Sequence, residues 1–170
     1  MIHATTNSSF HAYIQTQDVR IGTANDTNTR YLFKFTNDMS GAVQYAYPEQ
    51  QLYNRYSKFS FSYNAVPDVF LGRVDLKPAG YWKYEVYEVT WGAFAALDNE
   101  QAPSTELAVL LPASIRRGVV QGLVTKGKML VSELSGTEEV QYTQNGGEVI
   151  SLDIAYGGVG YPIAPTVTIT

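Results

Sequence analysis

The chain has 170 residues, which predicts one domain, or one domain with an appendage. Its net charge is −4, its pI is about 5.1, and only 16% of its residues are charged, whereas roughly 25% is usual for soluble proteins. A surface that binds nucleic acid is normally basic, so this balance argues against DNA or RNA as a partner, and the lack of cysteine excludes disulfides and thiol chemistry.

The composition favours lasting contact with other proteins. Hydrophobic residues make up 45% of the chain, and tyrosine is abundant, with 13 residues. A tyrosine side chain combines a large contact area with a polar tip, which suits β-sheet faces and interfaces. No apolar run approaches the roughly 20 residues of a membrane-spanning helix. We therefore expect protein partners, with no membrane and no nucleic acid.

The first 29 residues predict an arm, a strand and a loop. Residues 1–9 are small and polar and predict an arm, whereas residues 10–21 alternate loosely and predict a first strand. Turn-forming residues dominate 22–29, which predicts a loop. Residues 25–28 are expected to form an ordinary turn; a calcium loop is the alternative, although the spaced carboxylates of an EF-hand are missing.

Three segments alternate between apolar or aromatic residues and polar ones, and they predict strands at 30–36, 56–63 and 81–91. We expect their aromatic faces to fill the space between two sheets. The residues concerned are Phe33, Phe35, Phe59, Phe61, Trp82 and Tyr84. An exposed stacking platform for sugars or bases is the alternative, and the alternation with Lys and Ser argues against it.

Weaker patterns complete the predicted fold. Three further strands are expected, at residues 43–47, 69–76 and 138–142. Residues 119–133 predict a hairpin with its turn at Lys126-Gly127-Lys128. Short strands with a turn about every 8–12 residues are typical of an all-β sandwich, so we expect an antiparallel β-sandwich of the jelly-roll or Ig-like kind.

Residues 92–117 break this rhythm. Ser104 is placed to cap a short helix, but a strand over 105–111 explains the residues equally well, and Pro112 ends either element. Arg116 and Arg117 form the only adjacent basic pair in the sequence. Solvation is the commoner role of such a pair, and contact with an acidic partner is the alternative.

The sequence carries no recognisable catalytic arrangement. A serine nucleophile needs a base such as histidine, and the two histidines, His3 and His11, both lie at the N-terminus. Two carboxylates suffice for glycoside hydrolysis, and Glu85, Glu88 and Glu133 lie on predicted strands, where surface charge is their commoner role. We therefore expect no catalytic, cofactor-binding or metal-binding residues and no enzymatic activity, with a small glycosidase as the rival hypothesis.

The C-terminal segment is separated from the body by the turn-forming residues 144–147, which predicts a body at 1–143 and a module at 144–170. This module has two strand-like runs joined by a glycine-rich corner. The corner is not a phosphate loop, because no Gly-Lys-Ser/Thr follows and Pro162 and Pro165 prevent a helix. We expect either an assembly arm that adds a strand to a neighbouring chain or a closing β-hairpin on its own body.

The tail pattern is Gly-x-Val-Ile-Ser-Leu-x-Ile, followed by Gly-x-Gly-Tyr-Pro-x-Ala-Pro-Thr-Val-Thr-Ile. It resembles a short module of virion structural proteins of tailed phages, many of them marine, where it recurs in capsid-associated, fibre and tail proteins. The body, at residues 36–41 and 80–88, is similar to phage structural sandwiches. The resemblance covers about 24 residues of the tail and transfers no known site residues.

The resemblance implies a virion structural protein, made in the host cytoplasm and located on the capsid surface. A capsid decoration or cement protein is the first expectation, and its partners would be the major capsid protein or other virion proteins. It would act as a homo-oligomer, with a trimer the first expectation because capsid lattices offer three-fold sites. A neck, tail or fibre component and a carbohydrate-binding receptor-recognition module are the alternatives. The expected assembly contacts are Tyr156, Gly158, Gly160, Tyr161, Pro165, Val167 and Ile169.

Overall fold

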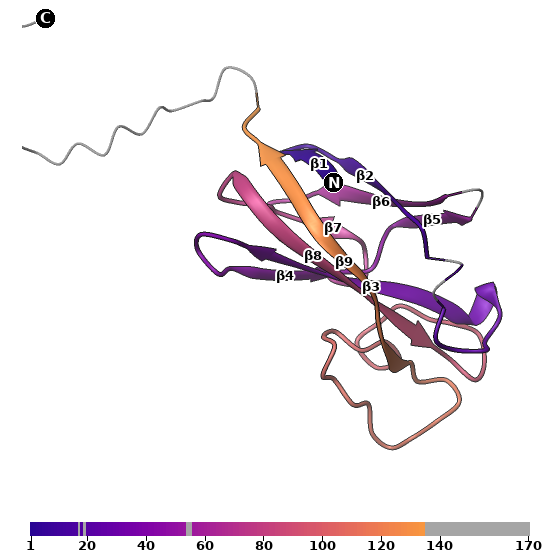
Figure 1. Cartoon of the computed structure of the whole chain (residues 1–170). Coiled ribbons are helices and arrows are strands. Elements are labelled where there is room, and N and C mark those ends of the chain that lie inside the picture. Colours follow the sequence, from indigo (N-terminus) through magenta and orange to yellow (C-terminus); the bar gives the residue numbers. More distant parts are fainter. Residues whose placement is uncertain (17, 19, 54–55, 135–170) are drawn as a thin grey trace, which may run out of the picture. The chain divides into compact units, whose positions relative to one another are not determined.

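The computed structural model describes residues 1–16, 18, 20–53 and 56–134 (Figure 1). Within these residues the fold is all-β, as predicted, and it includes the short 3-10 helix η2 (Asp26–Asn28). No helix in the described ranges has the length and apolar character that crossing a membrane requires. The strands are β1 (Ile2–Thr5), β2 (Phe10–Ile14), β3 (Thr29–Asn37), β4 (Val43–Ala46), β5 (Gln50–Tyr53), β6 (Ser57–Tyr63), β7 (Arg73–Val74), β8 (Gly80–Thr90) and β9 (Val119–Ser132).

These strands form two sheets that pack face to face, which confirms the predicted sandwich. The larger sheet has the order β1-β9-β8-β3-β4, and the smaller has the order β2-β6-β5 with β7 beside β6. Neighbouring strands are antiparallel except for the pairs β1/β9 and β6/β7, which are parallel. The long strands β3, β8 and β9 lie side by side in the middle of the larger sheet (Figure 1).

The predicted aromatic core lies between the sheets. Phe33 of β3 packs against Phe59 and Phe61 of β6, with ring centroids 5.1 and 4.9 Å away, and Phe35 lies 5.5 Å from Phe61. Trp82 is also fully buried, and Tyr84 packs against the cluster from a partly buried position. Strand alternation therefore identified these side chains correctly, and their rings are not on the solvent face where a stacking platform would need them.

The N-terminal residues form an edge strand, so the prediction of an arm was wrong. Ile2 and Ala4 are buried in the core whereas His3 between them is exposed. This alternation lets β1 complete the larger sheet by pairing in parallel with the end of β9. The first strand of the prediction is also shorter than expected, because β2 ends at Ile14.

The expected strand at 69–76 is mostly a turn. The Asp68 carboxylate accepts hydrogen bonds from the backbone N–H groups of Phe70 and Leu71, at 2.9 and 3.2 Å. Gly72 has a φ of +67°, which favours glycine, and it lies close to the backbone of residue 49. Together these contacts reverse the chain and leave only the short strand β7.

Residues 119–132 form one continuous strand, so the predicted hairpin was also wrong. Lys126, Gly127 and Lys128 lie in the middle of β9 and pair with Glu85, Tyr84 and Lys83 of β8. A Cβ atom at residue 127 would lie 2.6 Å from the Tyr84 hydroxyl oxygen, so this glycine makes room for a ring and does not turn the chain. Register shifts along β9, opposite residues 86–89, keep the two long strands paired.

A second, smaller core lies on the outer face of the larger sheet. It consists of Leu32 of β3, Val89 of β8, and four further buried residues, Tyr47, Trp91, Ala95 and Ala102. The last three belong to the long loop 91–118 between β8 and β9, seen at the bottom of Figure 1. The sandwich is therefore covered on part of its outer face by this loop.

Two predicted features have different outcomes. Residues 25–28 form the ordinary turn that was expected: the Asn25 side chain caps η2 by accepting a 3.0 Å hydrogen bond from the N–H of Asn28. The strand expected at 138–142 and the module at 144–170 lie outside the described residues and stay predictions.

Candidate interaction surface

The loop 91–118 is fixed to the larger sheet along its first half. The hydroxyl of buried Tyr47 donates a 2.7 Å hydrogen bond to the carbonyl of Pro103, and the indole N–H of Trp91 donates one of 2.9 Å to the carbonyl of Gln101. The backbone N–H of Gly118 reaches the same Gln101 carbonyl at 2.7 Å, which closes the base of the loop. Burial raises the pKa of the Tyr47 hydroxyl, so this donor keeps its proton.

Glu106 provides a further anchor between the loop and the sheet. Its carboxylate lies 2.6 Å from Nζ of Lys34 on β3 and accepts a 2.5 Å hydrogen bond from the hydroxyl of Tyr45 on β4. Glu85 lies 3.6 Å from the same lysine, so the ammonium group has two carboxylates beside it. Hydrogen bonds to a charged partner are the stronger class, and these are only partly exposed to solvent.

The charges of this cluster stabilise one another. Burial raises the pKa of the Glu106 carboxyl group, but the hydrogen bonds from Lys34 and Tyr45 outweigh burial and hold the pKa below its ordinary value. The hydrogen bond to Glu106 raises the pKa of Lys34. Burial, followed by the contact with Glu106, raises the pKa of Tyr45 to about 12. Near neutral pH the anchor is therefore a carboxylate held by an ammonium group and a neutral phenol.

Beyond Glu106 the loop exposes large apolar side chains. We call them the apolar ridge: Leu107, Val109, Leu111, Ile115 and Val119, whose exposed fractions are 84%, 80%, 74%, 69% and 59%. Single exposed apolar residues are common on proteins, but several within one loop and the strand that follows it mark a site of contact. No helix or strand spans 105–111; the structure has turns and irregular backbone there, so both sequence interpretations of this segment were wrong.

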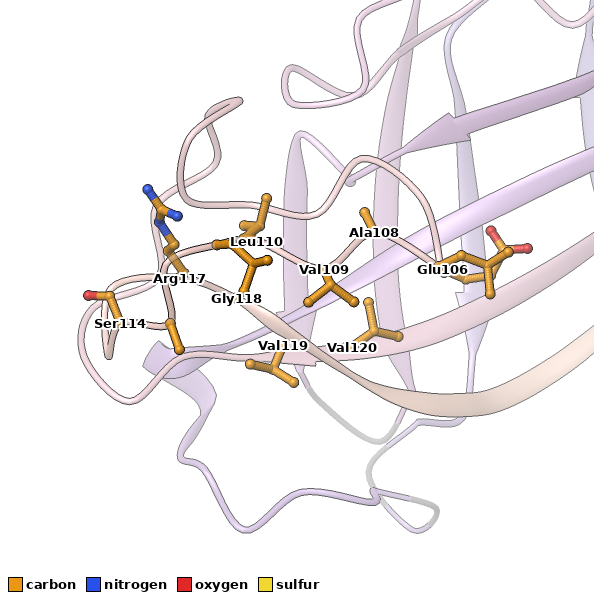
Figure 2. Close-up of a pocket in the computed structure, with 12 residues that line it drawn as sticks. Glu106, Ala108, Val109, Leu110, Ser114, Arg117, Gly118, Val119 and Val120 are labelled. Atoms are coloured by element: carbon orange, nitrogen blue, oxygen red, sulfur yellow. The ribbon is translucent and has the colours of Figure 1, made fainter.

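A hollow of about 260 Å³ lies within the ridge (Figure 2). Leu107, Val109, Leu111 and Val119 contribute apolar walls, and Glu106 and Arg117 lie at opposite ends of the row of side chains that Figure 2 shows. A second, more open depression adjoins the first, and the two share Ala113, Ser114, Arg117 and Val119. The first hollow is smaller than the roughly 300–1,000 Å³ of most small-molecule sites.

The basic pair Arg116-Arg117 borders this surface. Arg117 lines both hollows, and Arg116 is exposed beside it. Neither guanidinium forms an ion pair within the described part of the chain, whereas Arg20, Lys34, Lys77, Lys83 and Lys128 each have a carboxylate partner. The ridge thus combines apolar side chains with two positive charges that have no ion-pair partner among residues 1–134 as far as the structure describes them.

The carboxyl groups that sequence analysis offered for glycoside hydrolysis do not come together. Glu85 faces the outer side of the sheet beside Lys34, whereas Glu88 is fully buried and accepts hydrogen bonds from the N–H groups of Ile21 and Gly22, at 2.9 and 2.8 Å. Glu133 follows β9 and accepts a 3.4 Å hydrogen bond from Thr6. Each of the three carboxyl groups has different partners, so these candidates do not form a facing pair.

The other sequence candidates have separate outcomes. His3 and His11 line one depression between β1 and β2, but the described residues contain no group of three or more metal-ligating side chains that would hold an ion. The seven expected assembly contacts, from Tyr156 to Ile169, lie outside the described residues and stay a prediction. Sequence reasoning did not identify the apolar ridge, although the run Leu107-Ala108-Val109-Leu110-Leu111 before Pro112 was its signal.

Comparisons with known proteins do not extend this description. No protein-family model matches the chain, and neither the curated proteins nor the solved structures contain a match. The fold and the surface described above therefore carry the functional argument.

Proposed function

We propose that the chain is a virion structural protein of a tailed phage, without enzymatic activity, which binds the capsid lattice as a decoration or cement protein. The observation that carries the proposal is the apolar ridge: five large apolar side chains are exposed on and beside a loop whose base is fixed to the sandwich. Exposed apolar surface of this kind serves protein contact. The phage-like tail pattern supports a contact within a virion.

A fixed loop base suits repeated docking. Contacts of Glu106, Tyr47 and Trp91 hold the base of the loop, so the sandwich positions the residues from which the ridge extends. A pre-organised surface loses little conformational entropy when it binds, which leaves more of the contact energy for affinity. A lattice that offers many identical sites would favour such a surface over a flexible one.

The proposed partner is the major capsid protein, and the proposed assembly is a homo-oligomer with three-fold symmetry. Closed symmetric oligomers are the usual state of soluble assemblies, and a trimer matches the three-fold positions of a capsid lattice. The C-terminal module would contribute the contacts between copies or to the lattice. Native mass spectrometry of the full chain tests this: a mass of three chains is expected, and a monomer at all concentrations would contradict the trimer.

The location of the chain in purified particles tests the proposal as a whole. Mass spectrometry of gradient-purified virions should detect the chain in many copies, and immunogold labelling should place it over the head. Labelling confined to the neck, tail or fibres would support the alternative location instead. Absence from virions would exclude both.

A further inference from the structure

The hollow in the apolar ridge has the size and lining of a pocket that accepts side chains of another protein. At about 260 Å³ it falls below the range of most small-molecule sites, and its walls are mainly Leu107, Val109, Leu111 and Val119. A neighbouring protein would fill it with one or two apolar side chains. Apolar anchors in a pocket of this kind provide much of the energy of a protein interface.

Charge decides between the possible occupants. Arg117 lines the hollow and Arg116 is exposed beside it, and neither has an ion-pair partner among the described residues. The nearby carboxylate of Glu106 is already held by Lys34 and Tyr45. Within the described part of the chain, the positive charge at the rim is thus left for a partner. A guanidinium pairs best with a carboxylate, which it binds through two parallel hydrogen bonds.

We propose that the ridge receives an extended segment of a partner protein in which apolar side chains alternate with carboxylates. The apolar side chains enter the hollow, and Asp or Glu residues pair with Arg116 and Arg117. This inference rests on the proposed docking function and names the chemistry of the partner surface.

Two other occupants fit the surface less well. In a two-fold contact between copies of this chain, both arginine pairs would lie in the same interface, where like charges repel. A lipid bilayer is most often met by an amphipathic helix with a basic face, whereas this surface is an irregular loop around a hollow. Binding to a membrane is therefore treated as an alternative result of the experiment below.

Fluorescence anisotropy with labelled synthetic peptides tests the proposal on the full chain. The first probe is a short peptide of alternating Leu and Glu, and the second replaces each Glu with Lys. We expect the chain to bind the acidic peptide at least about tenfold more tightly than the basic one. The double variant Arg116→Glu/Arg117→Glu should reverse that preference. Equal binding of both peptides, or no binding of either, would overturn the proposal.

Matched variants show whether the peptide preference comes from the charges at the ridge or from the charge of the whole chain. Arg73→Glu changes another exposed arginine that lacks an ion pair in the described ranges, and it should leave both affinities unchanged. Arg116→Gln/Arg117→Gln is the second variant if the charge reversal disturbs folding, and it should weaken acidic-peptide binding without creating affinity for the basic peptide. A third probe is a phosphatidylserine vesicle. If the wild type bound these vesicles but not the acidic peptide, and the arginine variants lost vesicle binding, the proposal would be overturned in favour of a membrane.

The peptide result and the virion result are independent. A chain that is present in virions but does not distinguish the peptides would contradict this inference alone. A chain that binds the acidic peptide through its arginines but is absent from virions would contradict the proposed function alone.

Discussion

Lys34 and Glu106 lie 72 positions apart in the chain, and their side chains meet at 2.6 Å. The contact joins strand β3, which lies beside the edge strand β4, to the long loop between β8 and β9. On one side of Glu106 the loop is held by the second core and by hydrogen bonds, and on the other side the apolar ridge begins. The ion pair therefore sets the boundary between the fixed and the exposed parts of the loop.

Replacing Glu106 with glutamine should loosen this boundary. The variant keeps the shape of the side chain but removes the charge that holds Lys34, so we expect the free energy of unfolding to fall by about 1.5–3 kcal/mol. Urea unfolding measures the loss, and hydrogen exchange should show faster exchange at residues 98–118 than in the wild type. The control is Asp38→Asn, whose lysine partners are 61% and 64% exposed and whose loss should barely move the midpoint. An equal effect of the two variants would contradict the structural role of Glu106.

The same anchor predicts how stability depends on pH. The pKa of Glu106 is lowered in the folded chain, so its contribution is complete above the ordinary value of 4.5 and is lost as the pH falls through the lower folded value. The pKa values of Lys34 and Tyr45 are raised, the latter to about 12, so their contributions are complete below the ordinary values of 10.5 and 10.0 and are lost as the pH rises through the folded values.

Thermal unfolding across this range is the measurement. We expect the melting temperature to be constant over the middle of the pH range and to fall at both the acidic and the basic end. Glu106→Gln should reduce the fall at the acidic end, because the variant has no carboxyl group to titrate at that position. If the melting temperature of the variant fell at acidic pH as much as that of the wild type, other carboxyl groups would be the cause of the fall.

Gly22 should not tolerate a side chain. A Cβ atom there would lie 2.7 Å from Oε1 of Glu88 and 3.0 Å from Thr90, so alanine would displace the buried carboxyl group from its two backbone donors. We expect Gly22→Ala to destabilise the chain by about 1–3 kcal/mol. Thr23→Ala, at the exposed neighbouring position, should stay within about 0.5 kcal/mol of the wild type.

A double-mutant cycle tests whether Gly22 and Glu88 act through one contact. Glu88→Gln should destabilise the chain by itself, because the amide presents an N–H group to one of the backbone donors. The double variant should lose less than the sum of the single losses, since each substitution disrupts the same contact. Full additivity would mean that the contact does not connect them.

Deleting residues 148–170 should leave the sandwich folded. Both described core clusters consist of residues between Ile2 and Val131, so the deletion removes none of their side chains. We expect an unchanged circular dichroism spectrum and nearly the same melting temperature, together with weaker oligomerisation or capsid attachment. A truncated chain that unfolds outright would instead favour the closing β-hairpin on its own body.

Alternation along single strands made the central core predictable. Phe33, Phe35, Phe59 and Phe61 each lie two residues from another aromatic, and a period of two puts them on one face of a strand whatever the tertiary structure. The strands β3, β6 and β8 were found within one or two residues for the same reason. These predictions depended only on neighbours in the sequence.

The errors came from contacts between distant residues. From the local sequence, Gly127 indicates a turn. The structure shows that a glycine lies in the middle of β9 because the Tyr84 ring on the neighbouring strand occupies the space of a side chain. Ile2 pairs with Met129, a partner that no local pattern indicates. Leu32 and Val89 are buried together with residues of the loop 91–118, a contact that no local pattern indicates. The ridge was missed because Glu106, which fixes its base, takes its hydrogen bonds from Lys34 on β3 and Tyr45 on β4, far away in the sequence.

Co-sedimentation of the purified chain with capsids that lack it tests the central claim most directly. The informative variant is Leu107→Ser/Val109→Ser, because side chains exposed at 84% and 80% can change polarity with little effect on stability, within about 0.5 kcal/mol. Val66→Ser, at a position 75% exposed and outside the ridge, is the matched control. We predict that the wild type and the control sediment with the capsids and that the ridge variant binds at least about tenfold more weakly. Failure of the wild type to bind, or equal binding by the ridge variant, would contradict docking through the apolar ridge.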